Sequence, residues 1–393
     1  MAAHASCRAL AHRTGTSEQD WFPVFKARYG MRLAFDALRR IVGDGEVATQ
    51  LFTCCTAVDP ITAAGLTPRY ADIDAGTLSV TAASLRPLLS DATRAVVVQH
   101  TFGMVDDGSS AAVAAAAHAA GALVVEDCAH CVGRVARDGD GMSVADVSVH
   151  SFGVEKMLPT RFGGAIWVNP RLRDRMPQVD QTLRAALAGL PEPGVRLGMV
   201  TRTYVNQNRV FSRLGALGAR IRHACAAAGL YEPAIAPEEM AGGLRYPAYA
   251  MNAWMDRKAA AAIGALDANE ESRRRIVALY RRRLGAARGI EVPGGAMAGP
   301  AQPLLRFPLL AADTAAADRL IHAARAAGGY AEAWYRPELF PGVTDPAAYG
   351  LDRLDRATVV VSDEMVSRSL CLPTELGEDR AHAVCDAVCE AAC

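Results

Sequence analysis

The sequence predicts an α/β protein whose core is a mostly parallel β-sheet. Short, continuous apolar runs, typical of strands buried on both faces, occur at residues 95–100, 123–127 and 165–168. Between such runs lie segments with the composition and apolar spacing of helices, at residues 27–42 and 109–120. Strands that alternate with helices of this length indicate βαβ units and therefore a parallel sheet.

The remaining N-terminal elements follow in order. Residues 1–20 are polar and lack periodicity, so we expect a poorly ordered N-terminus. A strand begins at Gly45, and residues 65–74 read as a strand that runs into a loop, with an architectural role for Asp72 and Asp74.

The C-terminal part is expected to form a second, smaller α/β unit, because a chain of 393 residues exceeds one small core. Its elements are a long helix at 253–287, a strand at 304–309 and an amphipathic helix at 314–327. Before them, residues 170–240 combine proline-marked loops with Arg-rich helical stretches. The expected divisions are 1–20 N-terminus, 21–252 large domain, 253–288 linking helix and 289–393 small domain.

Composition excludes several classes of partner. The formal net charge is zero, and no basic block indicates nucleic acid or a membrane surface. The least polar stretch, residues 111–125, is broken by His118 and Gly121 and is too short for a membrane span. The first 20 residues lack an apolar core of signal-peptide length, so we expect a cytoplasmic protein.

The ten cysteines do not suggest a disulfide scaffold in a chain of this length. Cys128 and Cys131 form a C-x-x-C, which is half of a metal or redox site, but no second ligand pair stands nearby in sequence. Cys385, Cys389 and Cys393 share one face of an expected terminal helix. Packing as small apolar residues is the favoured interpretation of both groups, and no metal site is predicted.

Asp127 and Lys156 are the strongest candidates for chemistry. Each follows a predicted strand, and ligands of open α/β sheets bind beyond the carboxyl ends of strands. A carboxylate and an amine in one crevice suit pyridoxal phosphate: the lysine forms a Schiff base, and the aspartate keeps a proton on the pyridine nitrogen. A surface lysine and a strand-end turn residue are the alternative interpretations.

The motifs around these residues carry a resemblance. Glu126-Asp127-Cys128-Ala129-His130, then Ser151-Phe152 with Lys156 four residues later, then Gly163-Gly164 before a strand, resembles the DegT/DnrJ/EryC1/StrS family. His100-Thr101-Phe102-Gly103 and residues 367–374 resemble further family segments. The resemblance implies pyridoxal phosphate fold type I, with a seven-stranded, mostly parallel sheet in the large domain and a smaller C-terminal α/β domain.

The resemblance also implies roles for individual residues. His130 stands near the cofactor's ring oxygen, and Ser151 binds its phosphate; a turn histidine and a strand-end hydroxyl are the alternatives. Gly163 and Gly164 let a strand pass close to the cofactor. His100 either lines the pocket or is a buried, hydrogen-bonded histidine.

Two departures from the family pattern concern the phosphate and the ring. The turn that cradles the phosphate matches Tyr29-Gly30-Met31-Arg32, where Met31 replaces a hydroxyl residue. Arg32 either supplies charge to the phosphate or is a solvated helix residue. Cys54 stands where an aromatic residue stacks on the ring, and a thiol offers less stacking area.

The resemblance implies an assembly and an activity. Asn252 is the candidate that reaches the phosphate of a partner subunit's cofactor, so a homodimer is expected. The implied activity is transfer of an amino group from Glu or Gln to a keto-sugar nucleotide or keto-cyclitol, and Lys156 argues against the related dehydratases, which have histidine there. The alternatives are a pyridoxal phosphate enzyme with an amino-acid-like substrate and a cofactor-binding protein without turnover.

Overall fold

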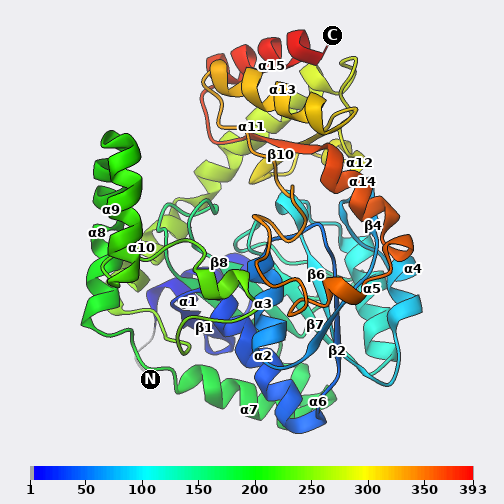
Figure 1. Cartoon of the computed structure of the whole chain (residues 1–393). Coiled ribbons are helices and arrows are strands. Elements are labelled where there is room, and N and C mark those ends of the chain that lie inside the picture. Colours follow the sequence, from blue (N-terminus) through cyan, green and yellow to red (C-terminus); the bar gives the residue numbers. More distant parts are fainter. Residues whose placement is uncertain (1–3, 393) are drawn as a thin grey trace.

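A seven-stranded sheet lies at the centre of the computed structural model, which describes residues 4–392 (Figure 1). The strand order is β1-β9-β8-β7-β6-β2-β3. Strand β9 runs antiparallel to both neighbours, and the pairs from β8 to β3 are parallel. The predicted mostly parallel sheet is confirmed. The strands are β1 Trp21–Val24, β2 Glu46–Thr49, β3 Thr67–Tyr70, β6 Thr93–Gln99, β7 Leu123–Asp127, β8 Val147–Ser151 and β9 Gly164–Val168.

Helices cover both faces of this sheet. Helix α2 (Ala27–Val42) buries Met31, Ala34, Phe35 and Leu38, which fall on one face at helical spacing. They share an apolar cluster with Val97 and Val125, whereas the neighbouring Val96 and Val124 pack with α5 (Asp107–Ala119). Successive strand residues point to opposite faces of the sheet, and helices cover both faces. Residues 95–98 of β6 and 123–125 of β7 are therefore apolar at every position.

Other helices of the first half and of the middle of the chain connect or flank these elements. They are α3 Cys55–Ala63, α4 Ala82–Leu85, α6 Leu172–Arg175, α7 Pro177–Ala188, α8 Val195–Arg213 and α9 Gly215–Ala227. Helices α8 and α9 form a hairpin that stands away from the rest of the chain (Figure 1). A short pair of strands, β4 Ile73–Asp74 and β5 Ser79–Val80, completes this part.

The N-terminal segment corrects one prediction. Residues 5–14 form a helix, α1 (Ala5–Thr14), rather than a poorly ordered end. The backbone N–H groups of Ala5 and Ser6 donate to the Asp256 carboxylate at 2.9 and 3.1 Å, and Leu10 is fully buried. Asp256 lies on a later helix, α10 (Ala253–Gly264), about 250 residues further along the chain, so no local sequence pattern predicts this cap.

The predicted long helix at 253–287 is two helices, α10 (Ala253–Gly264) and α11 (Leu266–Leu284). They meet at Ala265, whose φ of −95° and ψ of 2° are not helical. Gly264 precedes the break, and glycine disfavours a helix interior. The domain boundaries predicted from the sequence remain a prediction.

The C-terminal part has a sheet of its own, in which β10 (Arg306–Leu310) pairs antiparallel with β11 (Ser369–Pro373). Helices α13 (Thr314–Ala326) and α15 (Glu378–Ala392) pack side by side on this side of the molecule (Figure 1). On α15 Cys385 is buried, whereas Cys393 lies outside the described residues. The remaining helices are α12 Gly294–Met297 and α14 Val360–Arg368.

The segment between α13 and α14 returns to the large sheet. Phe340 donates its backbone N–H to the Thr53 carbonyl at 2.8 Å, and Cys55 donates to the Phe340 carbonyl at 3.0 Å. C-terminal residues are thereby placed beside the loop that precedes α3. Within residues 4–392, no helix has the length and apolar character needed to cross a membrane.

Candidate functional site

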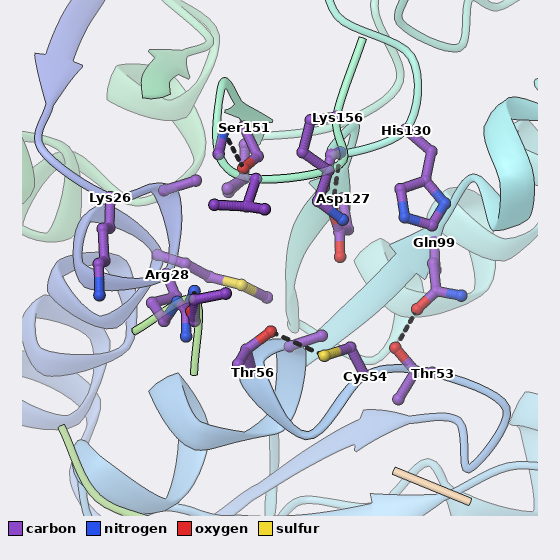
Figure 2. A pocket seen from close by; sticks show the side chains of 18 of the residues that line it. Lys26, Arg28, Thr53, Cys54, Thr56, Gln99, Asp127, His130, Ser151 and Lys156 are labelled. Atoms are coloured by element: carbon purple, nitrogen blue, oxygen red, sulfur yellow. Dashed lines mark hydrogen bonds between the residues drawn. The ribbon is translucent and has the colours of Figure 1, made fainter. Parts of the chain in front are cut away.

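A pocket opens at the carboxyl edge of β6, β7 and β8 and encloses about 820 Å³, its open mouth included (Figure 2). The last residues of these strands, Gln99, Asp127 and Ser151, all line it. This is the position at which open α/β sheets bind ligands.

Asp127 and Lys156 lie in this one pocket, as the strand-end argument requires (Figure 2). Lys156 lies in the loop between β8 and β9. Glu155 and Arg161 of this loop have positive φ values of 60° and 69°. Such backbone costs non-glycine residues about 1–3 kcal/mol each and clusters at functional sites. The loop therefore holds Lys156 in a conformation that the surrounding contacts must stabilise.

Burial in the pocket shifts the pKa of both Lys156 and Asp127. Burial lowers the pKa of Lys156 from its ordinary value, although Cys54 and Asp127 act in the opposite direction. Burial raises the pKa of Asp127, and the Ala129 N–H and Lys156 partly offset this rise. Lys156 is thus disposed to hold a neutral amine, the form that attacks a carbonyl or accepts a proton.

Asp127 retains an unsatisfied acceptor. Its Oδ1 accepts a hydrogen bond from the Ala129 N–H at 2.9 Å, and no residue within 4–392 donates to its Oδ2. An enclosed carboxylate with a free oxygen suits a ligand that brings a protonated nitrogen. The pyridine nitrogen of pyridoxal phosphate is such a group.

The opposite wall of the pocket is an anion site by its geometry. It contains the N-terminus of α2, with Lys26 at the cap and Ala27 and Arg28 in the first turn (Figure 2). Free N–H groups and the helix dipole favour an anion there. Ser151 lies near this end, and its Oγ accepts from the Gly153 N–H at 3.3 Å. A carboxylate at one wall and an anion site at the other fit the two ends of pyridoxal phosphate.

Carboxylates behind the wall hold both cations in place. Lys26 Nζ lies 2.5 Å from Glu232 Oε1, and Arg28 Nη1 donates to Glu239 Oε2 at 2.8 Å. Arg28 Nη2 also donates to the Ala234 carbonyl at 2.8 Å. Charges fixed by buried partners are positioned before any ligand arrives, which reduces the entropic cost of binding.

The turn predicted to cradle the phosphate, residues 29–32, does not open α2 but lies inside it. The helix already begins at Ala27, so Gly30 lies inside it and does not line the pocket. A Cβ on Gly30 would lie 2.5 Å from Ile166 Cγ1, so glycine here allows α2 to approach β9. Met31 does line the pocket. Arg32 points away from it and forms a surface ion pair with Asp36 at 3.2 Å.

Cys54 lines the pocket at the cap of α3, and its Sγ accepts from Thr56 Oγ1 at 3.0 Å. Hydrogen bonds from Cys55 and Thr56, aided by the Lys156 charge, lower its pKa to about 6. A polar thiol with a lowered pKa therefore stands at the position expected to face the ring.

His130 lines the pocket in a stack of aromatic rings. Its ring lies 5.5 Å from Trp334 at an interplanar angle of 15°, and Tyr335 Oη lies 3.3 Å from its Nε2. Burial holds the pKa of His130 well below its usual range, so the ring is neutral. His100 combines both expected roles: it lines the pocket, and its Nε2 lies 2.7 Å from Glu126 Oε1.

Asn252 does not line this pocket. Its side-chain oxygen accepts from the Met255 N–H at 3.0 Å and caps α10. A role for Asn252 at a partner subunit's pocket remains a prediction.

Sequence reasoning did not identify several lining residues, among them Lys26, Arg28, Gln99 and Tyr335. The predicted start of the first helix at residue 27 was a usable signal for Lys26 and Arg28, because an anion site belongs at a helix N-terminus. Tyr335 had no local signal, since it reaches the pocket only through the fold-back of the segment after α13.

Part of the chain is similar in sequence to known aminotransferases. Residues 26–186 match the model of the DegT/DnrJ/EryC1/StrS aminotransferase family. GDP-perosamine synthase of Caulobacter vibrioides is 32% identical over 139 residues, 35% of this chain and 37% of that protein. L-glutamine:2-deoxy-scyllo-inosose aminotransferase of Streptoalloteichus tenebrarius is 30% identical over 195 residues, 49% of this chain and 45% of that protein. The matched regions thus span less than half the length of these two relatives.

Solved structures resemble the whole chain. An aminotransferase from Streptoalloteichus hindustanus matches with a TM-score of 0.70 and 21% identity over 99% of this chain and 90% of its own. A sugar aminotransferase from Micromonospora echinospora matches with a TM-score of 0.69 and 22% identity over 98% of this chain and 91% of its own. At such identities these likenesses establish the fold, which is that of fold type I aminotransferases.

Proposed function

We propose that the chain is a pyridoxal phosphate-dependent aminotransferase, from the premise that residues 26–186 match the model of the DegT/DnrJ/EryC1/StrS aminotransferase family. The observation that carries the proposal is the shared pocket of Asp127 and Lys156, with an anion site at its opposite wall. When bound, the cofactor supplies an electron-accepting ring for amino-group transfer.

The surroundings of each pocket residue support a specific role for it. Lys156 would attach the cofactor through Nζ and then, as a neutral amine, move a proton to and from the substrate carbon. Asp127 would keep a proton on the ring nitrogen through its free Oδ2. Lys26, Arg28, Ser151 and the first amides of α2 would hold the phosphate. His130, which is neutral, would donate or accept a hydrogen bond at the ring oxygen.

For the substrates, we propose Glu or Gln as amino donor and a keto-sugar nucleotide or keto-cyclitol as acceptor, within a biosynthetic pathway. The names of the two curated relatives support this class, since one is a perosamine synthase and the other an L-glutamine:inosose aminotransferase. A homodimer in the cytoplasm is the proposed setting.

An alternative is a non-sugar, amino-acid-like substrate, and Cys54 favours it. A thiol with a pKa of about 6 beside Lys156 changes the polarity of the wall that would face the ring. The third possibility, a family member that binds the cofactor without turnover, rests on no additional observation.

A visible absorption spectrum separates the three. The purified protein should show the absorption band of lysine-bound cofactor, and glutamate or glutamine should bleach it while releasing the matching keto acid. Bleaching by a different amino acid alone, with a product other than an amine, would support the alternative substrate class. A bound cofactor whose band no amine alters would indicate a protein without turnover, and failure to bind the cofactor would overturn the proposal.

A further inference from the structure

Cys128, Cys131 and His100 form a compact group of buried side chains with atoms that can ligate metal, at the edge of the pocket that His100 lines. One ligand atom from each lies within 4.8 Å of the other two, and all three residues are buried. The sequence contained half of this group, the C-x-x-C, without a partner. The fold supplies the partner, because His100 follows β6 directly, Cys128 follows β7 directly, and these strands are neighbours.

Backbone hydrogen bonds fix the spacing of the three residues. His100 donates its N–H to the Asp127 carbonyl at 3.2 Å, and Cys128 donates to the Val149 carbonyl at 2.9 Å. A turn then closes between Cys131 N–H and the Cys128 carbonyl at 3.0 Å, which brings the second thiol back toward the first. The two thiols and the imidazole therefore meet on a rigid strand edge rather than on a free loop.

A buried carboxylate holds the ring of His100 in place. Its Nε2 lies 2.7 Å from Glu126 Oε1, and Glu126 is itself fixed by Ala136 N–H and by Ser148 Oγ at 2.5 Å each. A carboxylate that accepts one ring N–H sets the tautomer and leaves the other nitrogen as a donor to metal. Two thiolates and one imidazole select zinc among the common divalent ions.

We propose that His100, Cys128 and Cys131 bind one zinc ion. Zinc bonds of about 2.0–2.3 Å bring donors to roughly 3.5–4 Å of one another, so closure of the site requires side-chain shifts of about 1 Å. Each thiol loses its proton to solvent on binding, and water or another small ligand completes the coordination. The turn that zinc would fix carries Asp127 at one end and His130 within it. The proposal does not depend on the proposed aminotransferase function.

The test is the metal content of the intact protein purified under reducing conditions. Elemental analysis should find one zinc per chain in the wild type and in Cys225→Ala, a control cysteine on α9. The Cys128→Ala and Cys131→Ala variants should each lose the metal, because two protein ligands hold zinc far more weakly than three. Each substitution removes only one buried sulfur atom, a small truncation, so folding, checked by circular dichroism, should persist.

A second measurement uses the wild-type protein alone, so it tests the proposal even if the cysteine variants do not fold. Wild-type protein stripped with a chelator should take up Co²⁺ with a thiolate charge-transfer band and should unfold at a higher temperature once zinc is restored. Three results would overturn the proposal: no zinc in any preparation and no Co²⁺ band, zinc retained after both cysteine substitutions, or a Cys128–Cys131 disulfide found by mass spectrometry in freshly purified protein.

Discussion

Two lysines line the pocket, and burial lowers the pKa of both from the ordinary value, but their partners differ. Lys26 Nζ lies 2.5 Å from Glu232 Oε1, a contact that favours the ammonium form, whereas Lys156 has no carboxylate as close and lies 5.7 Å from the Trp334 ring centroid. The sequence contains one further lysine, Lys258, which is exposed on α10. Every candidate for covalent attachment of the cofactor can therefore be tested directly.

Borohydride reduction of the cofactor-loaded protein should label Lys156 and neither of the other lysines, because Glu232 holds the Lys26 amine in an ion pair and Lys258 does not line the pocket. Peptide mass mapping reads the site of the label. The Lys156→Ala variant should lose the label and about 10²- to 10⁴-fold of its transamination rate, the range for loss of a proton-transferring group. Lys258→Ala is the control and should behave as wild type. Label on Lys26 would contradict the assignment.

Asp127→Asn should lower kcat/KM about 100-fold or more, because an amide cannot stabilise the positive charge on a ring nitrogen. Cofactor affinity, measured by spectral titration, should fall much less, since the phosphate contacts remain. Asp140→Asn changes an exposed aspartate and serves as the control. Full activity of Asp127→Asn would show that this carboxylate does not contact the ring.

At the scale of elements, the N-terminus of α2 decides where an anion can bind. Arg28 and Arg32 stand one turn apart on this helix, but only Arg28 lines the pocket. Arg32 is paired with Asp36 at the surface. The pair provides a matched comparison of two arginines in one helix.

Arg28→Met should weaken cofactor binding about 10- to 100-fold, the equivalent of one charge-assisted hydrogen bond, and Arg32→Met should leave it unchanged. Binding of pyridoxal without its phosphate distinguishes a phosphate contact from a general loss of structure. If Arg28 binds the phosphate, its substitution reduces the preference for pyridoxal phosphate over pyridoxal. An equal effect on both ligands, or a larger effect from Arg32→Met, would count against the anion site.

Helix α3 carries a buried carboxyl group that links stability to pH. Asp59 is fully buried, its Oδ1 accepts from Tyr349 Oη at 2.5 Å, and its Oδ2 has no partner within residues 4–392. Burial raises its pKa from 3.8 to about 9. The folded state therefore binds the proton more tightly than the unfolded state, and stability is lost as pH rises from about 4 to 9.

Asp59→Asn should raise the free energy of unfolding at pH 8 by about 1–3 kcal/mol, because the amide is neutral at every pH. The gain should shrink toward pH 4, where the wild-type carboxyl group is protonated in both states. Denaturant titration at several pH values measures it, with the exposed Asp44→Asn as control. A destabilised Asp59→Asn at pH 8 would mean that the folded protein requires the charged carboxylate.

At the scale of the whole molecule, the α8–α9 hairpin leaves large apolar side chains exposed. Val195, Met199, Leu217 and Leu230, in and beside the hairpin, are each more than half exposed. Exposed apolar groups that gather on one element are typical of association surfaces. The homodimer expected from the family resemblance is consistent with this feature.

Gel filtration with light scattering should find the active protein at twice the chain mass of 41.6 kDa. Dilution should reduce activity together with the dimer fraction if a partner subunit completes each pocket. An active monomer at every concentration would contradict the predicted assembly. It would also leave Asn252 with its observed role as a helix cap alone.

The sequence by itself determined the parallel strands, the helices between them, and the order of Asp127, His130, Ser151 and Lys156 along the chain. These features are local: apolar runs mark strands buried on both faces, and chemistry-bearing residues follow at their ends. The start of the first helix was also predicted correctly. The phosphate turn expected at residues 29–32, however, falls inside this helix rather than at its start.

Only the tertiary structure decided which distant groups meet. Asp256 caps α1, Tyr335 reaches His130, and His100 joins Cys128 and Cys131, although none of these pairings has a periodic signal. The physical reason is that strand pairing and chain fold-back, not sequence separation, set the distance between side chains. Burial, which lowers the pKa of Lys156 and raises that of Asp127, likewise exists only once the walls of the pocket have closed around them.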